Sequence, residues 1–258
     1  MRTLRVVACL LVLAGARSSH ALPIRRLFEP TDLEVEDPGV AEVDLQLGPI
    51  RGPNSWRLVV PDFEVDLGLT REVELEVDGA VAVEDRSGEF DHLSPDNLWV
   101  SAKAGLGDVV FDQGHGDDDL RLAYGFQVGP KLPTAREAEG IGIEGLGLVG
   151  AHWRRTLVVL NLGGLMDPSA GRAGRPAGFE GGFDLDQILD DGGMWSLTGE
   201  LGGVLFTSDD ADQLTATAGF TYHATAMLDV SIVGLVGLTR GSDRGGVLLG
   251  ISPKFRLW

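Results

Sequence analysis

The stretch WRLVVPDFEVDLGLTREVELEVDGAVAV, residues 56–83, alternates apolar and acidic side chains from Pro61 onward, on both sides of a short break at Thr70–Glu72. Residues i and i+2 of a β-strand lie on the same face, so the stretch predicts a hairpin with one aliphatic and one acidic face. The acidic face consists of Asp62, Glu64, Asp66, Glu74, Glu76 and Asp78. A soluble β-sandwich usually carries both signs of charge on its outer face. This concentration of acids therefore favours a membrane barrel, with the apolar face toward lipid and the acidic face toward a water-filled lumen.

The N-terminal residues indicate export from the cytoplasm. Residues 1–21 have the pattern of a secretory signal peptide, with a basic start at Arg2 and Arg5, an apolar run over residues 6–16, and a small-x-small ending at Ser19–Ala21. The apolar run is shorter than the roughly 20 residues of a membrane-spanning helix. The single cysteine, Cys9, lies inside it, so the predicted mature chain has neither disulfide nor thiol nucleophile. We expect residues 22–38 to form a periplasmic lead and residues 39–258 to form a barrel in the outer membrane of a Gram-negative bacterium.

Composition and alternation predict an all-β fold. The chain has 258 residues and a formal net charge of −18, which argues against nucleic acid as a partner. A barrel strand needs only about 9–11 residues, and alternation hides such strands from hydropathy scans. We predict an antiparallel up-and-down transmembrane β-barrel of about twelve strands. Beyond the opening hairpin, strands are expected at residues 40–47, 98–106, 120–132, 140–151, 156–165, 178–188, 194–206, 214–223, 228–238 and 247–257, with loops at 85–96 and 107–119.

Loop lengths and tryptophans give a second indication of a barrel. If the first strand begins in the periplasm, the outward connections are generally longer than the periplasmic ones, although the predicted loop 107–119 breaks this rule. Trp153, Trp195 and Trp258 fall at predicted periplasmic strand ends, and Trp56 and Trp99 at outer ends, as in interfacial aromatic girdles. Trp99 nevertheless shares the phase of the polar face. The final residue, Trp258, is aromatic. Many outer-membrane barrels end in an aromatic residue, which the outer-membrane assembly machinery recognises. It is out of phase with the last apolar stripe, so this match is partial.

Several motifs resemble the putative outer-membrane transporters grouped with the meta-pathway phenol-degradation protein family. They are Phe28–Pro30, the WRLVVPDFEVDLGL run, Asp96–Trp99 before Lys103, and Gly129–Pro133. The resemblance covers most of the predicted mature chain. It implies an outer-membrane barrel of similar strand count that passes small, often apolar or aromatic, compounds.

The candidate functional residues are charged side chains expected on the lumen face. They are Glu42, Asp44, Asp62, Glu64, Asp66, Glu74, Glu76, Asp78, Lys103, Arg121 and Lys131. Further acids are expected on the same face at Glu144, Glu180, Asp184, Asp186 and Glu200. Acids opposed by bases in a lumen of about twelve strands set a transverse field and a preference for cations. The equally weighted alternative is that these residues only solvate and cross-link a filled lumen.

The sequence predicts no catalytic, metal or cofactor site. His92 near Ser94, and His115 near Asp117–Asp119, are the histidines considered, but no spacing places a serine and a histidine together and no GxSxG motif is present. The acidic turns lack the ligand spacing of a calcium loop. The glycines do not open a helix as in a phosphate-binding loop.

We therefore expect a non-enzymatic channel for small solutes, whose partners are the outer-membrane bilayer, the assembly machinery and the solute. The main alternative is a structural or surface-interaction barrel with a closed lumen. A barrel-embedded hydrolase and a soluble secreted β-sandwich are further alternatives.

Overall fold

The computed structural model describes residues 35–53, 55–85, 90–111, 120–135, 140–167, 177–207 and 212–258. The predicted signal peptide and most of the predicted lead, residues 22–38, lie outside the described residues. Within the described part of the chain, no helix is long and apolar enough to cross a membrane.

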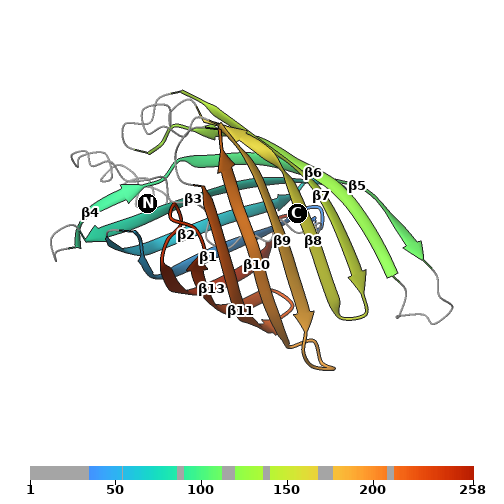
Figure 1. Ribbon diagram of the computed structural model, residues 1–258. Helices are drawn as coiled ribbons and strands as arrows, with labels where there is room; N and C mark the ends of the chain where they lie inside the picture. Colours follow the sequence, from blue (N-terminus) through green and yellow to red (C-terminus); the bar gives the residue numbers. More distant parts are fainter. Residues whose placement is uncertain are drawn as a thin grey trace, which may run out of the picture.

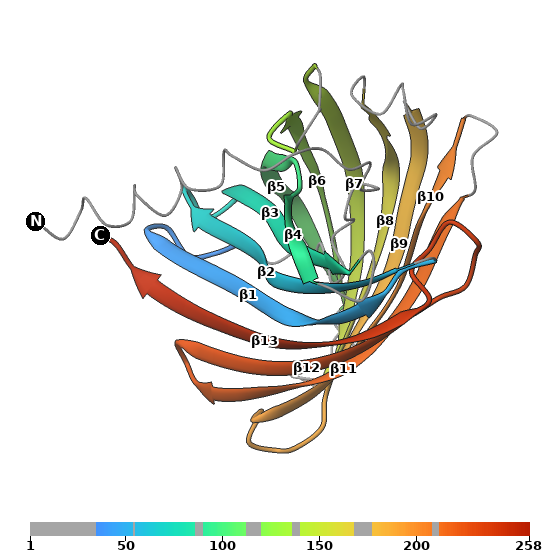
Figure 2. The ribbon, with the colours of Figure 1, turned by 90° about the vertical axis from the view of Figure 1, so that its left-hand side faces the viewer.

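Thirteen antiparallel strands form one sheet, and twelve of them close into a ring (Figures 1 and 2). Each strand of the ring pairs with the next along the chain, β1 also pairs with β13, and β3 passes directly to β5. The predicted twelve-stranded up-and-down barrel is therefore confirmed. The strands are β1 (Val40–Arg51), β2 (Trp56–Gly68), β3 (Val73–Asp85), β4 (Phe90–Pro95), β5 (Leu98–Phe111), β6 (Leu120–Leu132), β7 (Gly142–Trp153), β8 (Thr156–Met166), β9 (Ala177–Ile188), β10 (Trp195–Phe206), β11 (Gln213–Thr225), β12 (Leu228–Gly237) and β13 (Gly245–Arg256).

The strand outside the ring, β4, corrects the prediction of a loop at residues 85–96. It pairs with the second half of β3, from Val81 to Asp85, whereas β5 pairs with the first half, from Val73 to Asp78. Between β4 and β5 the backbone N–H of Asp96 donates to the carbonyl of Ala80, which keeps the chain beside β3. This strand is short and polar, so it carries no alternation from which it could be predicted.

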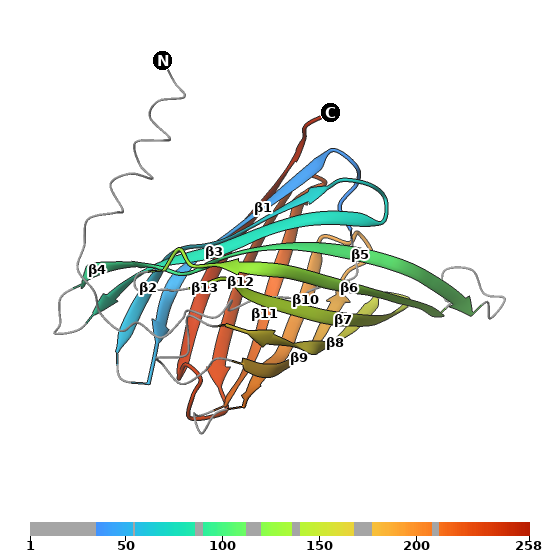
Figure 3. The ribbon, with the colours of Figure 1, turned by 90° about the horizontal axis from the view of Figure 1, so that it is seen from above.

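The predicted loop at residues 107–119 is also wrong in its first part, because β5 continues to Phe111. Residues 107–111 pair with residues 120–124 of β6, beyond the point where β3 begins. The register shifts between Gly105 and Gly107, and Gly107 has a φ of +154°, so a β-bulge interrupts the alternation there. The β5–β6 hairpin projects past its neighbours (Figure 3).

The two faces of the barrel differ sharply in polarity. On the inner face Glu74, Glu76 and Asp78 are 1–2% exposed, whereas Phe179 and Leu205 on the outer face are 70% and 62% exposed. The outer apolar band on alternate residues is thus confirmed. In β2 the phase holds only from Pro61 onward, because the β2–β3 register shifts between Val59 and Asp62.

One apolar cluster lies on the inner face at the end of the barrel away from the chain termini. Ile50, Val59, Leu235 and Leu248, from β1, β2, β12 and β13, are 0–6% exposed and pack together. These four adjacent strands therefore enclose a small apolar core, while the rest of the inner face carries both polar side chains and buried apolar ones such as Leu148, Val159 and Val204.

The connections at the two ends of the barrel differ in length, as the sequence predicts. At the end with residues 35–39 and 257–258, which we call the terminal end, the turns are 69–72, 154–155, 189–194 and 226–227, with the longer 112–119 as the exception. At the opposite end the connections are 52–55, 86–97, 133–141, 167–176, 207–212 and 238–244. In the turn 189–194 the carboxylate of Asp190 accepts backbone N–H bonds from Trp195 (2.8 Å) and Gly192 (3.1 Å), and these bonds hold the pKa of Asp190 below its ordinary value.

Three of the five tryptophans are exposed on the outer surface near strand ends: Trp56, Trp153 and Trp195. Trp258 is also exposed, but it follows the end of β13 and lies beside Gly39. Trp99 does not belong to this set. It lies on the inner face, where its ring is 5.3 Å from the Nζ of Lys131, which is buried. The placement of Trp99 in an outer girdle is therefore corrected, in agreement with its phase.

Candidate functional site

The inner faces of β1, β2 and β3 carry a continuous set of carboxylates, which we call the acidic wall. Its members are Glu42, Asp44, Asp62, Glu64, Asp66, Glu74, Glu76 and Asp78. Cross-strand register places Glu42 opposite Asp66, and Asp66 opposite Glu76. Neighbouring strands are about 4.8 Å apart, so like charges in such a row repel strongly unless cations or donors compensate them.

Strands β5 and β6 supply donors that face the acidic wall. Lys103 Nζ lies 2.8 Å from Glu74 Oε1, and both side chains are almost fully buried. Gln127 Nε2 donates to Glu76 Oε1 (2.7 Å) and to Ser101 Oγ (2.8 Å). The structure thus brings Lys103 to the acids as the sequence predicts, and it adds Ser101 and Gln127, which the charge pattern alone did not identify as site residues.

The end of the N-terminal lead closes the acidic wall at the terminal end of the barrel. The backbone N–H of Glu36 donates to Glu74 Oε2 (2.6 Å), and Lys254 Nζ contacts both Glu36 Oε1 (2.6 Å) and Glu42 Oε2 (2.9 Å). A Cβ on Gly68 would lie 2.2 Å from the carbonyl oxygen of Glu36, so only glycine allows this close approach. Burial raises the pKa of Glu36, but the hydrogen bonds and charge of Lys254 outweigh burial and leave that pKa below its ordinary value.

Lys131 lies inside the barrel, as predicted, but in a different group. Its Nζ forms a buried ion pair with the carboxylate of Asp167 and lies over the ring of Trp99. Asp167 follows β8, so this contact links β6 to the connection after β8. Alternation does not predict this partner, because β7 and β8 lie between the two residues in the chain.

Arg121 lies outside the group of lumen residues, which corrects its assignment to the lumen. Its side chain is 61% exposed and its Nε is 3.7 Å from Asp108 Oδ2, itself 53% exposed. Arg121 has the inward phase of β6, but it lies on the part of the β5–β6 hairpin that extends beyond β3. The alternation of the strand shows that Arg121 points inward, but it does not show that Arg121 lies beyond the end of β3.

The additional acids extend the polar lining round the barrel. Glu180 and Asp184 on β9 are buried, and Asn161 Nδ2 donates to Asp184 Oδ2 (3.0 Å). Three more acids are partly buried on neighbouring strands: Glu144 on β7, Asp186 on β9 and Glu200 on β10.

A serine, a histidine and an aspartate are also linked on the inner face at the terminal end. His223 Nδ1 lies 3.0 Å from Asp229 Oδ1, and His223 Nε2 lies 3.3 Å from Ser196 Oγ. This order of atoms is that of a serine-hydrolase triad. Ser196 is only 1% exposed, however, so the same contacts also serve to tie β10, β11 and β12 together. The residues considered from the sequence do not contribute: His115 lies outside the described residues, and for His92 only the backbone is described.

Comparisons with known proteins define the class of fold. No family model matches the chain, and no curated protein matches it. A solved structure of KdgM porin matches with a TM-score of 0.50 and 9% identity, covering 84% of this chain and 99% of that chain. KdgM porin in complex with disordered oligogalacturonate matches with a TM-score of 0.53 and 11% identity, covering 83% and 99%. At these identities the likeness concerns the fold alone. The chain has the fold of an outer-membrane porin, while the resemblance to the meta-pathway grouping stays a prediction.

Proposed function

We propose that the protein is a channel of the Gram-negative outer membrane that passes small solutes through an acidic lumen. The observation that carries this proposal is the polarity of the closed ring: carboxylates line its inner face and large apolar side chains cover its outer face. An outer surface of that kind requires lipid, since monomeric soluble proteins rarely expose contiguous apolar area beyond a few hundred Å². The likeness in fold to KdgM porin supports the same reading.

The orientation follows from the unequal ends of the barrel. Short turns, together with the residues that lead into β1 and follow β13, are typical of the periplasmic side, and the longer connections are typical of the outer side. We infer that residues 1–21 are removed as a signal peptide, that residues 22–38 precede the barrel in the periplasm, and that the assembly machinery reads the aromatic residue Trp258.

The acidic wall defines the solutes that the channel favours. KdgM porin has been solved with oligogalacturonate, a polyanion. A wall of carboxylates repels polyanions, so this chain is expected to favour cations and neutral compounds. The passage of apolar or aromatic compounds is implied only by the family resemblance, and it stays a prediction.

Reversal potentials in planar bilayers under a salt gradient test the channel and its selectivity together. Replacing Asp62, Glu64, Asp66, Glu74, Glu76 and Asp78 by asparagine and glutamine should reduce the preference for cations. Glu72→Gln is the matched control, because Glu72 is exposed in the turn between β2 and β3. If the variant with all six substitutions has unchanged ion selectivity, these acids only solvate and cross-link the lumen and do not select ions.

The closed-lumen barrel is the main alternative, and the buried ion pair of Lys103 with Glu74 favours it. If a folded, heat-modifiable protein gives neither conductance nor solute flux, the channel is excluded and the closed-lumen reading stands. Recovery of the protein from periplasmic extract, in place of washed outer membranes, would exclude both membrane functions.

A hydrolase is the second candidate function, favoured by the contacts of Ser196, His223 and Asp229. With its proton on Nδ1, His223 accepts the hydroxyl proton of Ser196 through Nε2 while Asp229 orients the ring. A fluorophosphonate probe should then label the folded protein, and Ser196→Ala should abolish labelling while Thr198→Ala does not. Equal labelling, or none, would leave these contacts a purely structural role.

A further inference from the structure

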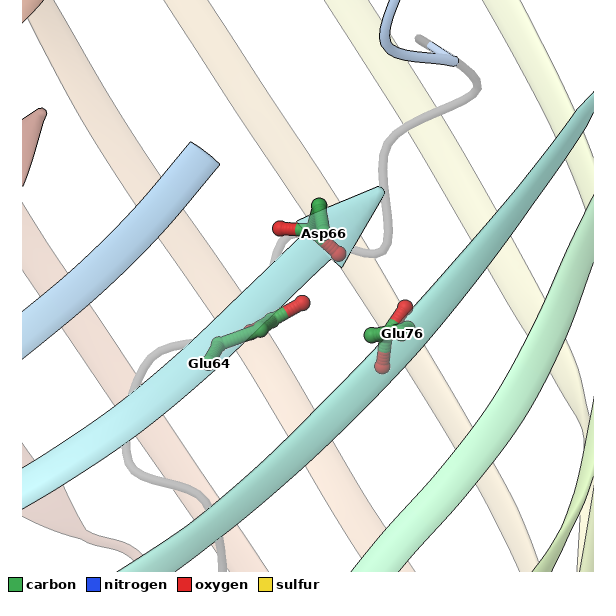
Figure 4. A group of neighbouring side chains, drawn as sticks. All are labelled: Glu64, Asp66 and Glu76. Carbon is green, nitrogen blue, oxygen red and sulfur yellow. The ribbon is translucent and has the colours of Figure 1, made fainter. Parts of the chain in front are cut away.

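We propose that Glu64, Asp66 and Glu76 bind a divalent cation, Ca²⁺ in preference to Mg²⁺, inside the barrel. Glu64 and Asp66 rise from β2 and Glu76 rises from the adjacent β3 (Figure 4). One carboxylate oxygen from each residue lies within 4.8 Å of the other two. The site deepens the proposed channel function, because it gives the acidic lumen a particular ligand, but binding itself does not require transport.

The spacing of the oxygens fits Ca²⁺. Calcium binds oxygen at about 2.3–2.6 Å, so ligands on opposite sides of one ion are separated by at most roughly 4.6–5.2 Å. Magnesium binds at about 2.0–2.1 Å, which brings opposite ligands to roughly 4.0–4.2 Å. The three oxygens all lie within 4.8 Å of one another, so small side-chain movements bring them to one Ca²⁺, whose coordination geometry is flexible. Mg²⁺ requires a tighter, near-ideal octahedral arrangement and gives up its water reluctantly, so this open carboxylate cluster suits it less well. Carboxylates are hard ligands that suit these ions, and water supplies the other positions.

Asp66 provides an independent indication of a ligand. The residue is 8% exposed, and its Oδ1 has no hydrogen-bond partner among the described residues. A buried carboxylate oxygen without a partner costs free energy, and here it lies between two further carboxylates. A divalent cation at this position both satisfies the oxygen and cancels the repulsion in the row formed by Asp66 and Glu76.

The surroundings hold the cluster in place. Gln127 donates to Glu76 Oε1 and is itself tied to Ser101, which is the kind of outer contact that orients a metal ligand. On either side, Lys103 contacts Glu74 and Lys254 contacts Glu42, each within 3 Å. These lysines flank the cluster and pair with the carboxylates next to it.

Calorimetric titration with Ca²⁺ tests the site directly. The sample is the full chain, purified, folded in detergent and stripped of metal with EDTA. We expect one saturable site per barrel with a Kd of roughly 10⁻⁴–10⁻³ M, in the range of other modest calcium sites. Mg²⁺ should bind more weakly. Asp66→Asn should weaken Ca²⁺ binding at least about tenfold, since it removes one of three charged ligands. Glu200→Gln is the matched control, because it removes a partly buried acid from β10 on the other side of the ring and should leave binding unchanged.

Two results would overturn the site: no saturable Ca²⁺ binding up to about 10 mM, or equal binding by the wild type and Asp66→Asn. Heat-modifiable mobility shows whether a variant is folded, and Glu64→Gln, which changes the least buried ligand, replaces Asp66→Asn if the latter does not fold. Bilayer recordings then separate the two proposals. If Ca²⁺ reduces the conductance of the wild type but not that of the variant, both the channel and the Ca²⁺ site are supported. Ca²⁺ binding without conductance excludes the channel alone, and conductance without Ca²⁺ binding excludes the site alone.

Discussion

Removal of the Lys103 ammonium should destabilise the barrel far more than removal of an exposed cation. Lys103 Nζ and Glu74 Oε1 are 2.8 Å apart, and their side chains are 8% and 1% exposed. At that separation the attraction is roughly 6 kcal/mol for an effective dielectric constant of about 20, which is an upper limit because desolvation opposes it. Removing one partner of a buried pair typically costs about 3–5 kcal/mol, and we expect that loss of unfolding free energy for Lys103→Met.

The double variant Lys103→Met/Glu74→Gln should recover most of this loss, because neither charge is then buried alone. Urea unfolding of the protein in phospholipid vesicles, followed by tryptophan fluorescence, measures each free energy by linear extrapolation. Arg121→Met is the control: its ion pair with Asp108 is exposed, so it should cost about 0–1 kcal/mol. If Lys103→Met costs no more than Arg121→Met, the pair is hydrated like a surface pair and the inner wall is wetter than its burial indicates.

Three further perturbations have expected outcomes. Leu248→Ala should lower the unfolding free energy by about 2–5 kcal/mol, because Leu248 is 1% exposed in the inner apolar cluster. Leu249→Ala changes a residue on the outer, lipid-facing side and should lower it much less. Equal losses would contradict the assignment of the two faces. Gly163→Ala should cost about 1–3 kcal/mol or prevent folding, because the added Cβ would lie 1.9 Å from a carbonyl oxygen of β7, while Gly147→Ala meets its nearest atom at 3.6 Å and should fold. The stabilisation from Asp190, whose pKa is lowered in the folded state, is present above the unfolded value of about 3.9 and is lost as pH falls through the folded pKa. The protection factors of the amides in its turn, corrected for the intrinsic exchange rate, should fall over that range, and Asp190→Asn should remove this pH dependence.

Alternation predicts the two faces of each strand, because one face points to the barrel interior and the other to the outer surface. β2 and β3 keep strict alternation beyond Pro61, and their inward acids are where the phase places them. The bounds of β6 were also predicted correctly, at Leu120–Leu132. From Asp62 to Gly68 of β2, and along β6 where it pairs with β7, no register shift interrupts the pattern.

The features that alternation does not predict depend on the pairing register of neighbouring strands and on how far each strand extends along the barrel axis. A pattern with a period of two specifies neither. The bulge at Gly107 breaks the phase of β5, so residues that continue the strand resemble a loop. Arg121 has the correct phase but lies beyond the rim formed by β3. The contact between Glu36 and Lys254 joins residues 218 apart in the sequence, and only closure of the ring brings them together.

The metal-ligand cluster was partly visible in the sequence. Alternation places Glu64, Asp66 and Glu76 on one face, but it does not predict that they form a group, because the partner of Asp66 on β3 depends on the length of the intervening turn. The contacts of Ser196, His223 and Asp229 were missed for the same reason, since each residue lies on a different strand.

The pairing of β1 with β13 sets the order in which the chain can fold. Val40 pairs with Arg256, so the ring cannot close until almost the whole chain is present, whereas most of the other strand pairs form between neighbours in sequence. Contacts of such long range make folding slow. Until closure, the edge of β1 presents free N–H and C=O groups that another chain can pair with. The edge of β1 is therefore a site for aggregation before closure, and a chain shortened before β13 would keep this edge open.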